Sequence, residues 1–193
     1  EGNLDWKSRV REKQSPLRLN ENEMMMAFES TRAFISQKVK GQYPAPMTIV
    51  GNELYVGSYQ GALAALALES GDIIWLTEAS IYAGMAVDED AVFVSESDGS
   101  VMALSRFTGR EIWKKDNLLN RYPSAPVIIG DSIILGDLEG YLHWLDKESG
   151  ETQQRISIGK DKISSVPLVM QDTVIVQTDG GNLVSVKTFI PSS

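Results

Sequence analysis

The sequence lacks cysteine, contains a single histidine and has no long apolar run. The absence of cysteine excludes disulfides, thiolate metal sites and a cysteine nucleophile. His143 has no second ligand or nucleophile near it in the sequence, so we expect no catalytic or metal role for it. No apolar run approaches the roughly 20 residues that a helix needs to span a bilayer. Phosphate-binding loops, serine-nucleophile motifs, EF-hand loops and zinc spacings are also missing. We therefore predict a protein that is not an enzyme and has no cofactor or metal site.

Positive charge is scarce as well. The chain holds 18 Lys and Arg against 26 Asp and Glu, which gives a net charge of −8. A nucleic-acid backbone is repelled by such a surface, so we expect no nucleic-acid partner. Residues 7–40 are the exception, with eight Lys and Arg against four Asp and Glu. A segment of opposite charge is either a contact surface or a solvated charged loop.

A repeat of about 40 residues runs through the chain. One pattern recurs four times: an apolar residue is followed five positions later by a glycine and ten positions later by a second apolar residue. Successive glycines are separated by 38, 41 and 41 residues. These glycines are Gly61, Gly99, Gly140 and Gly181. A near-constant period of this length is typical of repeat architectures.

Each repeat contains short apolar runs joined by tight turns, such as Gly51-Asn52, Asp88-Glu89, Gly130-Asp131 and Gln171-Asp172. Gly, Asn and Asp tolerate the positive φ that two-residue hairpins require. Four such strands form one antiparallel meander, which is the size of a propeller blade. A β-sandwich also has many short strands, but nothing in it makes one turn recur at a constant period. We therefore predict an all-β fold, a β-propeller of four-stranded antiparallel blades with PQQ-like or WD40-like repeats.

The tryptophans and the acidic pairs of the repeats are expected to have structural roles and not catalytic ones. Trp75 and Trp113 end the fourth run of their repeats, and we expect their rings to cover the next blade and to donate the indole N–H to a turn carbonyl. The acidic pairs fall in predicted turns, where we expect ordinary solvated side chains; they are Asp88/Asp90, Glu96/Asp98 and Asp137/Glu139.

The repeat predicts how the chain is divided. Gly2 to Trp6 matches Gly71 to Trp75, so we expect the chain to start inside a truncated blade. The predicted parts are an outer strand (1–10), an insertion (11–43), blade one (44–82), blade two (83–122), blade three (123–163) and an incomplete blade four (164–193). Four blades rarely close a ring, so we expect the C-terminal half of a larger propeller.

The insertion carries a helical pattern. Asn20 and Glu23 have the spacing of a capping box, and Met24, Phe28 and Ile35 fall near one helix face. Such a helix either docks on a partner or membrane surface, or packs on its own propeller.

The connections between blades are the predicted binding sites. A rigid scaffold fixes these loops while their sequence is free to vary, so binding residues gather there. The residues that we predict to contact a partner are Gly41, Gln42 and Tyr43 before blade one, and Arg121 and Tyr122 before blade three.

The segment Gly140-Tyr141-Leu142-His143-Trp144, with its lead-in Ser124-Ala125-Pro126-Val127, resembles the BamB family of outer-membrane assembly lipoproteins. The resemblance covers residues 41–187 well, and the family pattern Asp-x-Glu-Gly-Tyr-Leu-His-Trp runs here from Asp137 to Trp144. The resemblance implies an eight-bladed, lipid-anchored propeller on the periplasmic face of the outer membrane of Gram-negative bacteria. It also implies a non-enzymatic scaffold that binds the POTRA domains of BamA and assists the insertion of β-barrel proteins.

This chain departs from the family pattern at the expected contact with BamA. The family contacts BamA through an acidic pair just before the first of these blades, where this chain reads Gly41-Gln42-Tyr43. A fragment of a quinoprotein dehydrogenase and a generic interaction propeller are the alternatives, because blades alone do not fix a function. We also expect that unfolded barrel proteins pair with outer strand edges, and that two copies associate about a two-fold axis with Gly2 to Trp6 filling the edge of blade four.

Overall fold

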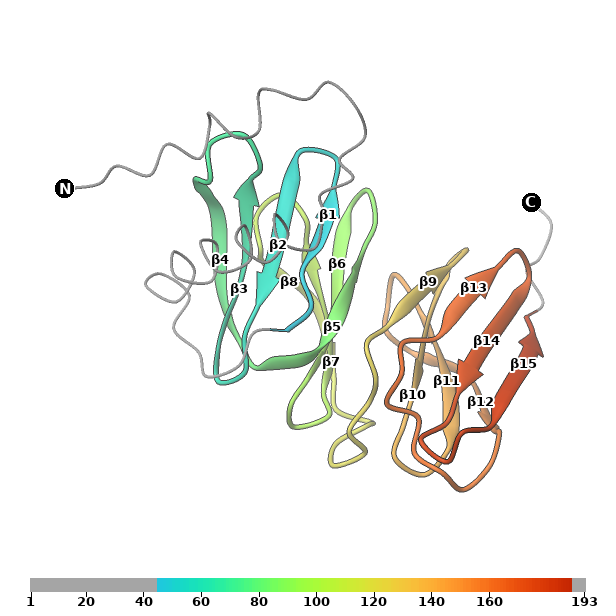
Figure 1. Cartoon of the computed structure of the whole chain (residues 1–193). Helices are drawn as coiled ribbons and strands as arrows, with labels where there is room; N and C mark the ends of the chain where they lie inside the picture. Colours follow the sequence, from blue (N-terminus) through green and yellow to red (C-terminus); the bar gives the residue numbers. More distant parts are fainter. Residues whose placement is uncertain (1–44, 189–193) are drawn as a thin grey trace, which may run out of the picture.

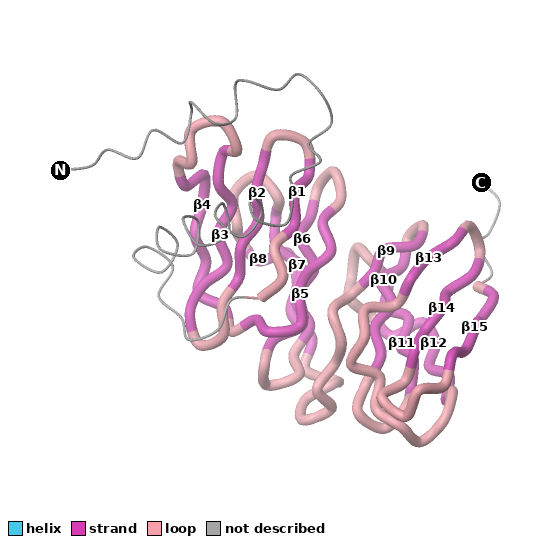
Figure 2. Tube along the Cα trace, viewed as in Figure 1, coloured by secondary structure: helices cyan, strands magenta, loops and turns pink. Residues whose placement is uncertain are grey.

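The computed structural model describes residues 45–188 (Figure 1). The predicted outer strand, the insertion with its helix and Gly41, Gln42 and Tyr43 lie outside these residues. Within the described part, strands are the only long regular elements, and turns and loops connect them (Figure 2).

The strands form four antiparallel sheets that follow one another along the chain. The first sheet contains β1 (Thr48–Val50), β2 (Glu53–Gly57), β3 (Gly61–Ala67) and β4 (Ile73–Ala79). The second contains β5 (Ile81–Val87), β6 (Ala91–Glu96), β7 (Val101–Ser105) and β8 (Glu111–Lys115). The third contains β9 (Val127–Ile129), β10 (Ser132–Gly136), β11 (Tyr141–Asp146) and β12 (Thr152–Ser157). The fourth contains β13 (Leu168–Met170), β14 (Thr173–Gln177) and β15 (Leu183–Lys187).

Every sheet is a simple meander, and the sheets are arranged as propeller blades. Strand order within a sheet equals chain order, and the first strands contact one another in series, β1 with β5, β5 with β9 and β9 with β13. The first strand of each sheet is therefore innermost, and β4, β8 and β12 are the outer strands (Figure 1). The prediction of a propeller with four-stranded antiparallel blades is confirmed.

Most of the predicted turns close as expected. Val50 pairs with Glu53, Ile129 with Ser132 and Met170 with Thr173, so each of these hairpins has a two-residue turn. The tight turn predicted at Asp88-Glu89 lies one residue further along, at Glu89-Asp90, because Val87 pairs with Val92 and the Asp88 amide donates to the Ala91 carbonyl oxygen (3.0 Å). The carboxylate of Asp88 also accepts hydrogen bonds from the amides of Asp90 (2.9 Å) and Ala91 (2.8 Å) and so stabilises this turn.

The core lies between neighbouring sheets, because the middle strands are buried on both faces. In β6 the side chains of Val92 and Val94 pack toward the first sheet, whereas Phe93 packs toward the third. This alternation follows from the two-residue period of a strand. It explains why the blades read as continuous apolar runs in the sequence.

Tryptophan residues join consecutive blades, as predicted. Trp75 Nε1 donates a hydrogen bond of 2.6 Å to the carbonyl oxygen of Arg106, and Trp113 Nε1 donates one of 3.0 Å to that of Lys147. The corresponding position of the third blade is Gln154, an exposed residue of β12. The indole link is therefore present between the first and second and between the second and third blades.

Candidate partner-binding surface

The predicted residues Arg121 and Tyr122 lie in the connection from β8 to β9. Its backbone forms a tight turn in which the Arg121 amide donates to the Leu118 carbonyl oxygen (3.0 Å). The Asn120 amide donates to the Asp98 carbonyl oxygen (2.9 Å) and so ties this loop to the β6–β7 turn. At Gly99, φ is +99°, and a Cβ atom would come within 2.2 Å of the Leu118 carbonyl oxygen. Only glycine allows this approach, so the repeated glycine of blade two also positions the loop.

Asp137 is the centre of a buried polar network beside this loop. Its carboxylate Oδ1 accepts hydrogen bonds from the amides of Glu139 (2.9 Å) and Tyr141 (3.0 Å). Its Oδ2 atom lies 2.8 Å from His143 Nε2 and accepts a hydrogen bond of 2.6 Å from Arg121 Nε. Both carboxylate oxygens are therefore occupied by partners within the chain.

The environment of Asp137 favours its ionised form. Its side chain is fully buried, and burial alone raises the pKa of a carboxyl group. Hydrogen bonds from His143, from the Tyr141 amide, from Arg121 and from the Glu139 amide outweigh burial and lower the pKa of Asp137 to about 2. The Arg121 guanidinium also pairs with Glu139 at 2.8 Å, so its charge is balanced by two carboxylates.

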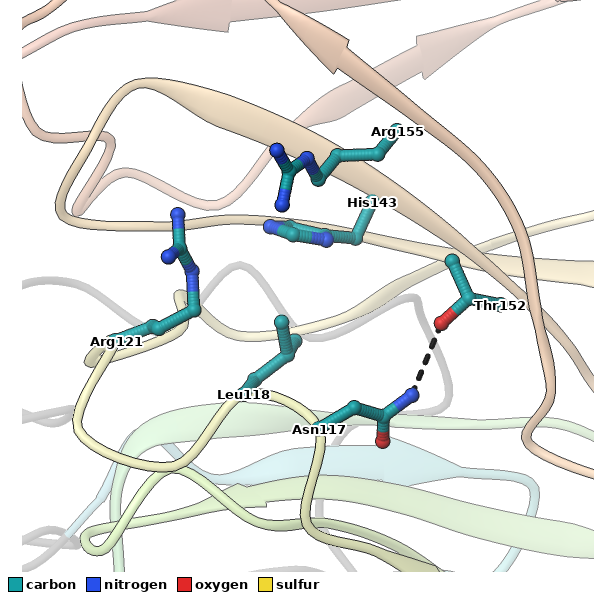
Figure 3. A pocket seen from close by; sticks show the side chains of 6 residues that line it. All are labelled: Asn117, Leu118, Arg121, His143, Thr152 and Arg155. Carbon is teal, nitrogen blue, oxygen red and sulfur yellow. Dashed lines mark hydrogen bonds between the residues drawn. The ribbon is translucent and has the colours of Figure 1, made fainter.

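A pocket opens beside this network (Figure 3). It has a volume of about 180 Å³ and is lined by Asn117, Leu118, Arg121, His143, Thr152 and Arg155. The side-chain Nδ2 of Asn117 donates a hydrogen bond of 3.0 Å to Thr152 Oγ1 and so joins the loop to the outer strand β12. The pocket is thus formed by three segments, the β8–β9 connection, β11 and β12.

Arg155 and Tyr141 complete one side of the site. The Arg155 guanidinium carbon lies 4.2 Å from the centre of the Tyr141 ring, and that of Arg121 lies 5.6 Å from it. These distances are typical of cation–π contacts. Arg155 lines the pocket and forms no ion pair with a carboxylate of residues 45–188.

Tyr122 is the exposed part of the same connection. Its side chain is 52% exposed and its φ is +48°, which is unusual for a residue with a side chain. Next to it, the Tyr82 hydroxyl donates a hydrogen bond of 3.4 Å to the Pro123 carbonyl oxygen. Burial, followed by the charge of nearby Tyr122, raises the pKa of Tyr82. The loop therefore presents an aromatic side chain on a backbone that is held on both sides.

The structure separates the predicted site residues. It places Arg121 in the pocket and Tyr122 in the same loop, whereas Gly41, Gln42 and Tyr43 lie outside the described residues. The prediction of ordinary solvated acids is wrong for Asp137 and for Glu96, which are 0% and 8% exposed. Burial is tolerated because Asp137 binds Arg121 and Glu96 binds Lys114.

Sequence reasoning missed four polar residues of the site: Asn117, Asp137, Thr152 and Arg155. The pattern from Asp137 to Trp144 contained one signal, since an acid and a histidine six residues apart span a β hairpin and can meet. Arg155 carried no such signal, because a lone charged residue on an outer strand is normally a solvated surface side chain.

No group of three or more His, Cys, Asp or Glu side chains within residues 45–188 is arranged to hold a metal ion. Among these same residues, no helix is long and apolar enough to cross a membrane.

Comparisons with known proteins point to one family. The family model described as outer membrane protein assembly factor BamB matches residues 29–115. A protein of Kangiella koreensis with that name is 36% identical over 133 residues, which are 69% of this chain and 34% of the relative. The crystal structure of BamB from Moraxella catarrhalis superposes with a TM-score of 0.70 at 30% identity, over 77% of this chain and 45% of that one.

A second group of solved structures shares the fold alone. The quinohemoprotein alcohol dehydrogenase from Comamonas testosteroni superposes with a TM-score of 0.52 at 22% identity, over 61% of this chain and 21% of that one. The chain also spans only about a third of the length of the curated relatives that it matches, 34% and 37% for two of them.

Proposed function

This chain belongs to the family of the outer membrane protein assembly factor BamB, and from that premise we propose that it serves outer-membrane protein assembly by binding another protein of the assembly machinery. In this proposal the partner is the set of periplasmic POTRA domains of BamA. The observation that carries the proposal is the family match together with a rigid propeller whose loop at Arg121 and Tyr122 is firmly held.

The proposed contact surface is the face that carries the connections between blades. Tyr122 offers exposed aromatic area on a fixed backbone, and such side chains are enriched at the centres of interfaces. Gly41, Gln42 and Tyr43 precede blade one in the sequence, as Arg121 and Tyr122 precede blade three. We propose that they contact the same partner.

The proposal is a binding role without catalysis. The related proteins are named as assembly factors, whereas the dehydrogenases are similar only in fold. We place the full-length protein at the periplasmic face of the outer membrane, held there by a lipid anchor, and we assign it to an eight-bladed ring. An alternative role as a dehydrogenase would require a quinone site and a cation site, and residues 45–188 contain no group of three or more His, Cys, Asp or Glu side chains arranged for a cation.

Client binding is a second element of the proposal. The outer strands β4, β8 and β12 each pair with one neighbour in the described part of the chain, so their outer edges offer unpaired backbone groups. An extended segment of an unfolded barrel protein can add to such an edge. Photo-crosslinks from an unfolded barrel protein should then map to these three strands, and crosslinks confined to the loops would exclude edge pairing.

Self-association is the third element. The fourth blade exposes Leu168 (66%), Met170 (62%) and Leu183 (73%), and apolar side chains grouped on one sheet face favour burial. A second copy related by a two-fold axis would cover them and rebuild an eight-bladed ring. Sedimentation of the 193-residue chain at high concentration should give the mass of a dimer, and a strictly monomeric mass would contradict this element.

The experiment that tests the main proposal measures binding of the full-length protein to purified BamA POTRA domains. Variants lacking residues 12–40 or carrying Tyr122→Ala should be compared with Phe107→Ala, which removes a comparably exposed aromatic ring (63%) elsewhere in blade two. Weaker binding of the Tyr122 variant alone would support the proposed loop. Loss of binding when residues 12–40 are deleted would place the contact in the insertion. If no form binds the POTRA domains, the chain would instead be a generic interaction propeller.

A further inference from the structure

The second and third blades can be compared position by position, because 41 residues separate their equivalent sites. Met102 pairs with Lys114 across β7 and β8, and His143 pairs with Arg155 across β11 and β12. Lys114 and Arg155 are therefore the same position in two successive blades, and Glu96 and Asp137 are the same acidic position.

The two blades neutralise this cation differently. In blade two, Lys114 binds Glu96, and this salt bridge raises the pKa of Lys114 despite partial burial. In blade three, the equivalent acid Asp137 binds His143, Arg121 and two backbone amides, which leaves no oxygen for Arg155. Arg155 instead lies over the Tyr141 ring, which replaces Ser100 of blade two.

The result is a pocket with one cation that no acidic side chain of the described chain neutralises. Arg121 also lines the pocket, but Asp137 and Glu139 balance its charge. The contact between the Arg155 guanidinium and the Tyr141 ring restricts the motion of this side chain and lowers the entropy lost when it binds a ligand. Asn117 and Thr152 add polar groups to the lining of the pocket, and Leu118 adds an apolar one.

We propose that this pocket binds a single carboxylate, supplied by an aspartate or glutamate side chain of the partner protein, with the guanidinium of Arg155 as its counter-ion. The inference rests on the proposed function, since it names one contact on the partner-binding surface. One uncompensated cation suits a monoanion better than a phosphate group, which carries up to two charges at neutral pH. The same loop exposes Leu119 (42%) and Tyr122 (52%), which suits an acidic residue that is flanked by apolar neighbours in a peptide.

The charge of the whole chain limits how such a ligand arrives. A net charge of −8 repels an acidic partner at long range, so electrostatic steering does not assist association. Affinity must come from the fork-shaped hydrogen bonds between guanidinium and carboxylate at short range. An isosteric amide in place of the carboxylate should therefore bind much more weakly.

The first arm of the test uses a probe that does not depend on BamA. The full-length protein is titrated with the capped dipeptide acetyl-Asp-Leu-amide, and chemical shifts are followed by NMR; acetyl-Asn-Leu-amide and inorganic phosphate serve as comparison ligands. We expect the aspartyl peptide to shift the signals of Arg155, Asn117 and Leu118, and to bind about tenfold more tightly than the asparaginyl peptide. Arg155→Gln should abolish this preference, and Arg155→Lys should retain part of it.

The matched control is Arg110→Gln, which removes the same charge from another exposed residue of the described chain, away from the pocket. It should leave the preference unchanged. Equal binding of the two peptides, shifts that map elsewhere or an unaltered response of Arg155→Gln would overturn the inference. Saturable binding of phosphate without binding of the aspartyl peptide would assign the pocket to a phosphate group instead.

The second arm separates this inference from the proposed function. Binding of the POTRA domains is measured for the wild type, Arg155→Glu and Arg110→Glu. Affinity that falls about tenfold for Arg155→Glu alone, and recovers when an acidic residue of the partner is changed to lysine, would support both the carboxylate inference and the proposed function. If the wild type binds and Arg155→Glu binds equally, the carboxylate inference fails and the proposed function stands. If the aspartyl peptide binds but the POTRA domains do not, the proposed function fails and the pocket stands.

Discussion

The indole ring of Trp75 lies directly against Gly109 of the next blade, so close that a Cβ atom on Gly109 would come within 2.5 Å of Trp75 Cε3. The same relationship recurs one blade later, where a Cβ atom on Gly150 would come within 2.6 Å of Trp113 Cε3. Both glycines also have positive φ, +66° and +71°. Each blade thus supplies a ring, and the following blade supplies the bare backbone on which the ring packs.

The first prediction tests this contact. Gly109→Ala should destabilise the protein by more than about 2 kcal/mol, because it adds a steric clash with the indole ring to the strain of a left-handed alanine. Gly181→Ala is the matched control, since Gly181 has a φ of +86° and no atom lies within 4 Å of the position that a Cβ atom would take there. We expect the control to lose only the strain, about 1 kcal/mol. Urea unfolding measures both, and equal losses would contradict a packing role for Gly109.

The second prediction concerns the indole hydrogen bond. Trp75→Phe keeps an aromatic ring but leaves the Arg106 carbonyl without the donor at 2.6 Å, and this should cost about 1–2 kcal/mol of unfolding free energy. Gln154→Ala is the control at the equivalent position of blade three, where the side chain is exposed, and it should change stability by less than about 0.5 kcal/mol. A Trp75→Phe variant as stable as the wild type would show that the indole hydrogen bond does not stabilise the packing of the blades.

The period of the sequence predicted the fold because propeller contacts are local and repeated. Gly99, Gly109 and Gly140 have the positive φ of tight turns, which favours glycine locally, so their spacing carried the blade pattern without knowledge of tertiary structure. The interblade role of Trp75 was likewise predictable from one amphipathic ring at a fixed position in each repeat.

The pocket was less predictable, because it depends on how equivalent positions differ between blades. Asp137 and Glu96 both lie at the end of a strand, and each is buried only because a cation from another segment reaches it, Arg121 in one case and Lys114 in the other. The first pairing depends on the path of the β8–β9 connection, and the second depends on the register between β7 and β8. Neither is encoded by the local run of residues around Asp137.

The third prediction uses a phenol at the interface of the first two blades. Tyr55 is buried and its hydroxyl donates a hydrogen bond of 2.5 Å to Glu53, while Arg106 Nε lies 2.8 Å from the same carboxylate. Burial, followed by the hydrogen bond to Glu53, raises the pKa of Tyr55 to about 12. The neutral phenol therefore stabilises the fold fully below the ordinary value of 10.0, and this contribution is lost as the pH rises through about 12.

Ultraviolet titration of phenolate formation checks this expectation. The absorbance difference between the wild type and Tyr55→Phe reports the Tyr55 phenolate and should titrate near pH 12. Glu53→Gln should lower the pKa of Tyr55, because an anion no longer opposes phenolate formation. Glu69→Gln removes a carboxylate from an exposed turn and serves as the control. A Tyr55 transition near pH 10 in the wild type would show that the buried hydrogen bond is not maintained in solution.

The fourth prediction concerns acid stability and the network beneath the pocket. Hydrogen bonds lower the pKa of Asp137 to about 2 from an ordinary value of 3.8, so its carboxylate stabilises the folded state at neutral pH. This shift corresponds to about 2 kcal/mol, which is fully present above about pH 5 and is lost as the pH falls toward 2. The sign follows because the unfolded chain binds a proton at higher pH than the folded chain does.

Asp137→Asn should remove this part of the pH dependence. Compared with the wild type, the variant should be less stable at pH 7, and the gap should narrow by about 2 kcal/mol between pH 5 and pH 2 because only the wild type gains a proton there. Asp131→Asn, a change at an exposed turn residue of the same blade, provides the control for the general effect of losing a carboxylate. Urea unfolding at several pH values gives the free energy of unfolding of the wild type and of each variant as a function of pH. A gap that stays constant with pH would mean that Arg121 and His143 do not stabilise the ionised carboxylate, and that Arg155 is not the sole cation left without an acidic partner at this pocket.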